Sequence, residues 1–280
     1  MEYRELGGTG VMVPEVGVGT WQYRGGVAPL RRGVELGATL IDTAEIYGTE
    51  GVVGEALKGI RERVFLATKV SGEHLRHGQV LRAADASLKR LGVQTIDLYQ
   101  VHWPDRDVPV AETMQALEEL VDAGKVRYIG VSNFSRREVE AAQASLRRNR
   151  IVANQVEYSL QQRQIEPDLP FYRENKITVI AYSPLGLGAL LSPQNRPELN
   201  TLRQVASAAG KTPAQVALAW CLSRPGVITI PKSDRVERVE ENCAASGWRL
   251  SEEQVATLDR AFGRGMVNGM QVYDELGFSE

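Results

Sequence analysis

The sequence is poor in the residues that form disulfide frameworks and metal sites. Its 280 residues include two cysteines and three histidines. Cys221 and Cys243 fall in helical patterns without metal-ligand spacing, so we expect buried thiols in a reducing compartment. His74 and His77 have His-x-x-His spacing, but no other Cys or His lies nearby, and a zinc site needs three or four ligands. We therefore predict no metal site.

Long apolar runs and blocks of like charge are also absent. Residues Met1–Glu5 include charged side chains and lack the apolar core of a signal peptide. No run reaches the length of a transmembrane helix. The net charge of −2 gives no reason to expect a nucleic-acid or membrane partner. These features predict a soluble protein, cytoplasmic by default.

Two glycine-rich stretches do not form a dinucleotide-binding fingerprint. Gly8–Val13 and Gly17–Gln22 both lack the last glycine of that motif, and neither lies between a strand and a helix. We therefore expect no Rossmann domain. Lysine is scarce too, with seven among 33 basic residues. This scarcity makes Lys69 and Lys232, both in apolar surroundings, candidates for more than surface charge.

What the chain does contain is a regular alternation of short apolar runs and helical patterns. The predicted strands are Glu15–Thr20, Thr39–Asp42, Val64–Val70, Ile96–His102, Val126–Ser132, Ile151–Tyr158, Thr178–Ser183 and Val227–Lys232. The predicted helices are Ala28–Leu36, Gly51–Ile60, Gly78–Leu91, Val110–Ala123, Arg136–Arg148, Ile165–Glu174, Pro213–Leu222 and Arg235–Ala244. Eight β/α pairs without a linker indicate an α/β protein, a closed (β/α)₈ TIM barrel that forms a single domain over residues 1–280.

Four segments fall outside this repeat. Tyr3–Pro14, with glycines between two short extended runs, predicts an N-terminal β-hairpin that plugs the barrel bottom. Leu199–Ala209 and Ser251–Phe262 predict two accessory helices, and a Ser-Glu-Glu start introduces the second. The glycine-containing tail Gly263–Glu280 predicts a loop.

Four polar residues lie at or just beyond the ends of predicted strands. Asp42, Lys69 and His102 each follow an apolar run, and Tyr47 comes five positions after Asp42. Polar side chains that end the parallel strands of a barrel meet at the mouth, where such enzymes keep their chemistry. An acid, a phenol, an amine and an imidazole brought together there can deliver a proton.

The amine is central to this chemistry. A free phenol has a pKa near ~10, and an ammonium within about 4–6 Å lowers it. A lysine inside a barrel loses its charge unless a carboxylate pairs with it, and Asp42 is the evident partner. Each residue alone has a structural explanation: Asp42 as an N-cap, Tyr47 as a packed aromatic, Lys69 as half of an inert ion pair and His102 as a core residue. The four together favour catalysis.

The contexts of these residues resemble the aldo-keto reductase family over essentially the whole chain. Residues 42–48, Asp-Thr-Ala-Glu-Ile-Tyr-Gly, are similar to the family signature Asp-Thr-Ala-x-x-Tyr-Gly, and residues 97–104, Asp-Leu-Tyr-Gln-Val-His-Trp-Pro, resemble its fourth strand. The resemblance implies a catalytic tetrad in which the tyrosine protonates a carbonyl oxygen and the histidine orients it. Its members would be Asp42, Tyr47, Lys69 and His102. The resemblance also implies a C-terminal loop over the barrel mouth.

The same resemblance implies a binding site for NADP(H). Near the nicotinamide and pyrophosphate the implied residues are Ser132, Asn133 and Gln155 for the carboxamide, Tyr182 for stacking, and Ser183 and Leu185 in a covering loop. Around the adenosine phosphate they are Lys232, Ser233, Arg238, Glu241 and Asn242. A strand-end loop that leads into a helix N-terminus suits an anion, and Lys232 and Arg238 can pair with a 2′-phosphate, which favours NADP over NAD. Trp21 and Trp103 are implied as apolar walls of the substrate pocket.

From these features we expect a monomeric NADPH-dependent reductase that converts aldehydes and ketones to alcohols by hydride transfer. In the reverse direction the same enzyme would oxidise alcohols with NADP. The alternative is an NADP-binding redox sensor on the same barrel with little turnover. An intact tetrad argues against that alternative, because a sensor has no need of all four groups. A phosphate-substrate isomerase barrel fits poorly, because it has no use for the set Ser132, Asn133, Gln155 and Tyr182. The sequence does not name a substrate.

Overall fold

The computed structural model describes residues 1–263, in which eight parallel strands form one curved sheet. Neighbouring strands in the sheet follow the order of the chain, so each strand pairs with the next. The strands are β3 (Val18–Gly19), β4 (Leu40–Asp42), β5 (Phe65–Val70), β6 (Ile96–Val101), β7 (Val126–Ser132), β8 (Ile151–Glu157), β9 (Thr178–Tyr182) and β10 (Val227–Thr229). The prediction of a (β/α)₈ barrel is confirmed.

The two edges of the sheet meet and close the barrel. Val16 forms a parallel bridge with Thr229, and Gly19 forms one with Lys232. Across the same seam the amide of Gly17 donates to the carbonyl of Thr229 at 2.8 Å. A Cβ at Gly19 would lie 2.6 Å from the carbonyl oxygen of Ile230, so glycine permits the close approach of the two edge segments.

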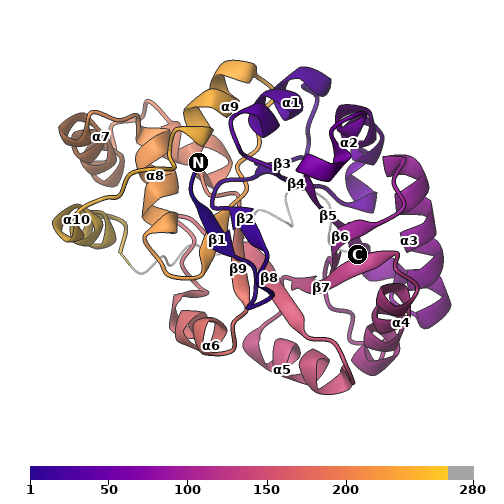
Figure 1. Cartoon of the computed structure of the whole chain (residues 1–280). Helices are drawn as coiled ribbons and strands as arrows, with labels where there is room; N and C mark the ends of the chain where they lie inside the picture. The colour runs from indigo at the N-terminus through magenta and orange to yellow at the C-terminus, as the bar shows by residue number, and fades with distance from the viewer. Residues whose placement is uncertain (264–280) are drawn as a thin grey trace.

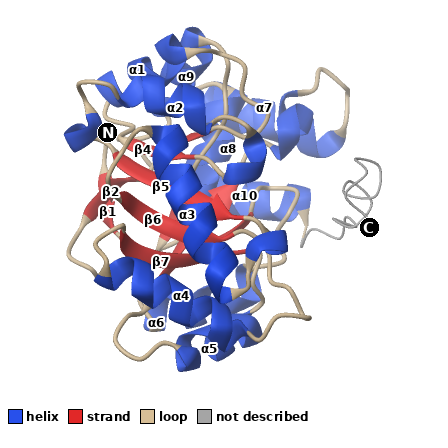
Figure 2. Ribbon diagram, turned by 90° about the vertical axis from the view of Figure 1, so that its right-hand side faces the viewer, coloured by secondary structure: helices blue, strands red, loops and turns tan. Residues whose placement is uncertain are grey.

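Helices surround the strands on the outside (Figures 1 and 2). The eight that alternate with strands are α1 (Val27–Glu35), α2 (Glu50–Leu57), α3 (His77–Leu91), α4 (Val110–Asp122), α5 (Arg136–Ser145), α6 (Leu169–Glu174), α8 (Pro213–Leu222) and α9 (Val236–Cys243). The predicted accessory helices are confirmed as α7 (Pro197–Ala209) and α10 (Glu252–Phe262), which pack against each other beside α8. Short 3₁₀ turns are η1 (Glu45–Tyr47), η2 (Arg61–Arg63), η3 (Gly72–His74), η4 (Glu166–Asp168) and η5 (Gly186–Leu191).

The N-terminal hairpin lies across one end of the barrel (Figure 1). Its antiparallel strands are β1 (Tyr3–Glu5) and β2 (Met12–Pro14). Leu6 and Val13, both fully buried, pack in one apolar cluster with inward-facing residues of the barrel strands. The predicted plug is therefore confirmed, and it leaves the opposite end of the barrel for a site.

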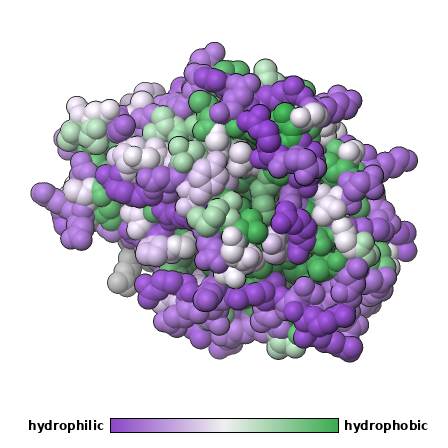
Figure 3. All heavy atoms as spheres, in the orientation of Figure 1, coloured by the Kyte–Doolittle hydropathy of each residue, from purple (hydrophilic) through white to green (hydrophobic). Residues whose placement is uncertain are grey.

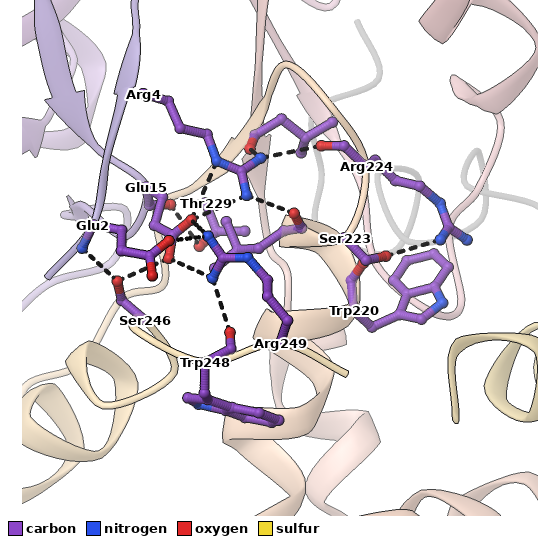
Figure 4. A network of polar contacts seen from close by, with 12 residues as sticks. Glu2, Arg4, Glu15, Trp220, Ser223, Arg224, Thr229, Ser246, Trp248 and Arg249 are labelled. Atoms are coloured by element: carbon purple, nitrogen blue, oxygen red, sulfur yellow. Dashed lines mark hydrogen bonds and ion pairs between the residues drawn. The ribbon is translucent and has the colours of Figure 1, made fainter. Parts of the chain in front are cut away.

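A buried ion cluster joins this hairpin to the seam of the barrel (Figure 4). The Glu15 carboxylate is fully buried and accepts from Arg4 at 3.0 Å and from Arg249 at 2.9 Å. Ser246 donates to the same carboxylate at 2.8 Å. Arg4 also donates to the carbonyls of Leu222, Arg224 and Val227, near the start of β10. Every charge in the cluster has a partner, as burial requires.

Most predicted boundaries agree with the structure to within a few residues, and the larger differences have local causes. The predicted helix Arg136–Arg148 ends at Ser145, because the Glu118 carboxylate captures the backbone amides of residues 147, 148 and 149. The predicted helix Ile165–Glu174 begins as the 3₁₀ turn η4 before α6. Residues 264–280 of the predicted C-terminal loop lie outside the described part.

On the face of the molecule that carries the hairpin, hydrophilic residues predominate at the rim, and apolar residues lie among them toward the middle (Figure 3). Within residues 1–263 no helix is long and apolar enough to cross a membrane. Both cysteines are buried as predicted, Cys221 in α8 and Cys243 in α9, and neither forms a disulfide.

Candidate active site

On strands β4 and β6 the inward-facing side chains change from apolar to polar along the strand. On β4, Leu40 belongs to the apolar interior and Asp42, two residues later, is a buried acid. On β6, Leu98 is followed by Gln100 and then by His102 just past the strand. Because side chains alternate between the two faces of a strand, residues two apart share the interior. The polar layer therefore lies at the carboxyl ends of the strands, away from the hairpin.

Asp42 and Lys69 form a buried ion pair in this layer. Lys69 Nζ lies 2.6 Å from Asp42 Oδ1 and also donates to the carbonyl of Thr43 at 2.9 Å. The Lys69 side chain is completely buried. Burial lowers the pKa of the Lys69 ammonium, and the Asp42 carboxylate opposes that change. The lysine charge thus depends on the aspartate beside it.

Tyr47 and His102 complete the predicted tetrad. The Tyr47 hydroxyl lies 3.5 Å from Lys69 Nζ and 3.3 Å from His102 Nε2. Burial, and then the charge of Lys69, lower the pKa of His102 from 6.5 to about 3. The imidazole is therefore neutral at physiological pH and offers one donor and one acceptor. The structure brings together all four residues that the sequence predicted for proton delivery.

The turn that carries Tyr47 is anchored through its first residue. Glu45 opens η1, and its largely buried carboxylate accepts from the Ser71 amide at 2.9 Å and from His74 Nδ1 at 2.7 Å. Gly48 then ends the turn with a φ of 68°, a left-handed conformation that glycine adopts without strain. These contacts tie the turn that carries Tyr47 to the loop after β5.

A fifth polar residue, Gln100, belongs to this layer and was missed in the sequence. The second oxygen of Asp42 accepts from Gln155 Nε2 at 2.8 Å and from Gln100 Nε2 at 3.3 Å. Gln100 is fully buried on β6. Its spacing offered a usable signal, because a residue two positions before His102 on the same strand faces the same side.

The residues predicted for the nicotinamide carboxamide lie next to the tetrad. Asn133 Nδ2 donates to the carbonyl of His102 at 3.0 Å and to Ser132 Oγ at 3.1 Å. Tyr182 donates its hydroxyl to Asn133 Oδ1 at 3.0 Å. Gln155, already bonded to Asp42, pairs in register with Ser132. Hydroxyl and amide groups beside a partly exposed tyrosine ring fit a planar ring that carries a carboxamide.

Several residues at this end of the barrel hold an unusual backbone conformation. Asn133, Ser183 and Leu187 all have positive φ, at 61°, 47° and 53°. Non-glycine residues rarely adopt such values, and they concentrate at functional sites. Ser183 and Leu185 accept backbone hydrogen bonds from Gly186 and Gly188, so the loop predicted to cover the pyrophosphate is a tight turn.

The residues predicted for the adenosine phosphate lie beyond β10, and both basic ones are paired with carboxylates. Lys232 Nζ lies 2.5 Å from Asp234, and Arg238 lies 2.8 Å from Glu241. Ser233 donates to the Arg235 carbonyl at 3.3 Å. The Lys232 side chain is about one-third exposed and that of Arg238 about half exposed, whereas Asn242 is buried in α9.

The two tryptophans predicted for the substrate pocket each directly follow a residue just past the end of a barrel strand. Trp21 directly follows Thr20 after β3 and is partly exposed, and Trp103 directly follows His102 with 40% exposure. His74 and His77 bond to different carboxylates, Glu45 and Glu119, at 2.7 and 3.1 Å. Across residues 1–263, no group of three or more His, Cys, Asp or Glu could hold a metal ion.

Comparison with known proteins identifies the lineage of this barrel. The sequence model of the aldo/keto reductase family matches residues 15–262, nearly the whole described chain. This chain belongs to the aldo/keto reductase family. Membership of this oxidoreductase family supports carbonyl reduction in general, as the resemblance found in the sequence implied.

Individual relatives agree with this assignment. The methylglyoxal reductase YeaE of Escherichia coli is 40% identical over 264 residues, covering 90% of this chain and 92% of the relative. The crystal structure of the thermostable aldo-keto reductase Tm1743 has a TM-score of 0.88 at 40% identity, covering 93% of this chain and all of that one. An aldo/keto reductase from Klebsiella pneumoniae, crystallised with NADP and acetate, has a TM-score of 0.83 at 39% identity, covering 92% and 94%.

Proposed function

We propose that this chain is an NADPH-dependent reductase of aldehydes and ketones in which Tyr47 is the general acid. One observation carries the proposal: the Tyr47 hydroxyl lies 3.5 Å from the Lys69 ammonium and 3.3 Å from His102 Nε2 at the open end of the barrel. A cation beside a phenol stabilises the phenolate, which makes the hydroxyl a better proton donor near neutral pH. General acids work best when their pKa approaches the working pH.

The ion pair tunes this acid. Asp42 keeps Lys69 charged in an environment that would otherwise strip its proton. The charged lysine then favours the anion that Tyr47 becomes after it has given its proton to the carbonyl oxygen. In the reverse direction the same phenolate accepts the proton of an alcohol.

The neutral His102 has a different task. A protonated imidazole would compete with Tyr47 as the acid, and the low pKa of about 3 excludes that form at neutral pH. Nε2 therefore orients the carbonyl oxygen by a hydrogen bond and leaves the proton transfer to the tyrosine. Trp21 and Trp103 are proposed as the apolar walls that exclude water from the substrate.

NADPH supplies the hydride when it is bound. Ser132, Asn133 and Gln155 are proposed to hold its carboxamide, so that one face of the ring points toward the tetrad. Tyr182 is proposed to support the other face. Lys232 and Arg238 are proposed to bind the 2′-phosphate. The Klebsiella relative crystallised with NADP supports this choice of cofactor.

The test is the variant Tyr47→Phe, which removes one oxygen and leaves the ring. NADPH oxidation is followed with a panel of carbonyl substrates that begins with methylglyoxal, for which the Escherichia coli relative is named. We expect kcat to fall by about 10²–10⁴-fold while NADPH still binds, as measured by quenching of tryptophan fluorescence. Turnover near that of the wild type in Tyr47→Phe would remove Tyr47 from this role. A wild-type protein that binds NADPH and turns over none of the panel would favour the sensor instead.

A further inference from the structure

Gln100 makes contacts that the proposed reaction leaves unexplained. It is an amide on a strand whose other interior residue, Leu98, belongs to the apolar core. The Gln100 side chain is fully buried, and burying an amide costs free energy unless its hydrogen bonds are made. Its Nε2 donates to Asp42 Oδ2 at 3.3 Å, and its Oε1 accepts from Gln155 Nε2 at 3.4 Å.

The barrel makes room for this side chain. In the sheet Gln100 pairs with Lys69 on one side and with Gly130 on the other. A Cβ at Gly130 would lie 2.9 Å from Gln100 Cγ and 3.0 Å from Leu98 Cδ1. Gly130 has no positive φ that would require glycine for its backbone. The missing side chain at Gly130 therefore provides the space that Gln100 occupies.

The amide of Gln155 has two partners, the carboxylate of Asp42 in this structure and the nicotinamide carboxamide in the proposed function. In the structure its Nε2 donates to Asp42 Oδ2 at 2.8 Å, the shorter of the two bonds to that oxygen. In the proposed function the same side chain binds the nicotinamide carboxamide. When Gln155 turns toward the cofactor, Asp42 Oδ2 keeps the amide of Gln100 as its donor.

We propose that Gln100 is a positioning residue that holds the Asp42 carboxylate against Lys69 while Gln155 engages the cofactor. This inference rests on the proposed function, because it needs the ion pair to tune Tyr47. If Asp42 loses the hydrogen bond from Gln100 while Gln155 is engaged elsewhere, its carboxylate becomes a stronger base. It then draws the proton of Lys69 toward itself. Lys69 then stabilises the Tyr47 phenolate less, and the apparent pKa of the tyrosine rises.

The experiment compares Gln100→Met, which keeps the volume and removes the donor, with wild type. We expect kcat to fall about three- to tenfold with the KM for NADPH within about twofold of wild type. The alkaline limb of the pH–kcat profile reports the loss of the Tyr47 proton in the enzyme–substrate complex. This limb should move to higher pH by about half a unit or more. The cofactor-free protein gives a second comparison. The titration of Tyr47 is read there from absorbance at 295 nm, as the difference from the same protein with Tyr47→Phe. The substitution Gln100→Met should shift the pKa of Tyr47 less in this state, because Gln155 still donates to Asp42.

Two controls separate positioning from a general loss of packing. Thr113, on the outer helix α4, is also buried and donates to the carbonyl of Leu75 at 2.7 Å. Thr113→Val should lower the melting temperature without moving the pH limb. Gly130→Ala, which places a methyl group against Gln100, should move the limb in the same direction as Gln100→Met. If Gln100→Met does not fold, Gln100→Asn, which withdraws the amide by one carbon, decides the question by the same limb.

A folded Gln100→Met protein whose pH limb coincides with that of wild type would overturn this inference. Loss of turnover in Tyr47→Phe in the same series would show that the proposed function stands without it. Retained turnover in Tyr47→Phe would overturn the proposed function itself, whatever Gln100→Met does.

Discussion

Lys232 Nζ lies 2.5 Å from the carboxylate of Asp234, two residues further along the chain. The other oxygen of Asp234 accepts from the backbone amide of Arg24 at 2.7 Å, which joins the loop after β3 to the loop after β10. The lysine proposed to bind the 2′-phosphate is therefore compensated before any anion arrives. A phosphate bound there would share Lys232 with a carboxylate, so we expect this pairing to limit the preference for NADPH over NADH.

Asp234→Asn should relieve this competition. Asparagine keeps an oxygen for the Arg24 amide and removes the negative charge, so the loop contact survives. Because Lys232 and Asp234 are partly exposed, we expect a modest gain, about two- to fivefold in NADPH affinity, with NADH affinity unchanged. Dissociation constants of both cofactors by fluorescence quenching test this. Equal gains for NADPH and NADH would mean that Asp234 acts on the shared part of the cofactor.

Lys232→Ala and Arg238→Ala should each weaken NADPH binding and leave NADH binding little changed. A lost charge-assisted bond to the phosphate costs roughly 1.5–3 kcal/mol, or about ten- to a hundredfold in affinity. Raising the salt concentration should weaken NADPH binding more than NADH binding, because salt screens the phosphate contact. Arg235→Ala is the matched control, since Arg235 is exposed and its only ion pair among the described residues is with Glu237 at 3.5 Å. A variant that loses both cofactors equally would contradict the assignment.

Lys69→Met should abolish most carbonyl reduction and also destabilise the fold. The substitution leaves Asp42 buried without its cation, although Gln155 and Gln100 still donate to it. Breaking a buried ion pair from one side costs about 3–5 kcal/mol, and we expect the lower end of that range. Urea unfolding measures the loss. Lys58→Met is the control and should unfold like wild type, because Lys58 is exposed and its ion pair with Glu55 lies at the surface. Wild-type reduction by Lys69→Met would show that Tyr47 needs no cation.

His102 predicts a pH dependence of stability. Its pKa falls from 6.5 to about 3 on folding because of burial first and of Lys69 second. Between those values the unfolded chain binds a proton that the folded protein does not, so stability decreases as the pH falls from 6.5 toward 3. The loss is at most about 1.4 kcal/mol per pH unit. Urea unfolding at pH 7.5 and 4.5 should show a smaller acid loss in His102→Gln. Equal losses in both proteins would place the titration elsewhere.

The sequence predicted the barrel because its strands are short apolar runs with few alternatives. The strand Val126–Ser132 and the helix Pro213–Leu222 have the same bounds in the prediction and in the structure. Such runs carry their own signal in burial and propensity. The end of α5 could not be predicted, because Glu118, in a different helix, captures the amides that follow Ser145. Local patterns do not encode contacts of that range.

The tetrad was predicted for a related reason, since each member ends or follows a strand and the strands of a barrel end at one mouth. The same rule does not reach Gln100, because this residue lies within strand β6 and not beyond its end. The pairing of Lys232 with Asp234 was also missed, although the two residues are neighbours. An aspartate near a lysine in a sequence does not show that both face the same way in a loop.

The groups proposed for proton transfer and those proposed for cofactor binding come from two separate stretches of the chain. Those proposed for proton transfer come from residues 42–102, and those proposed for the cofactor come from residues 132–242. The bond between Gln155 and Asp42 joins the two sets. A hybrid gene that takes its first half from this protein and its second from a relative would inherit acid–base chemistry from one parent and cofactor preference from the other. We expect such hybrids to work where the incoming half supplies an amide at the position of Gln155.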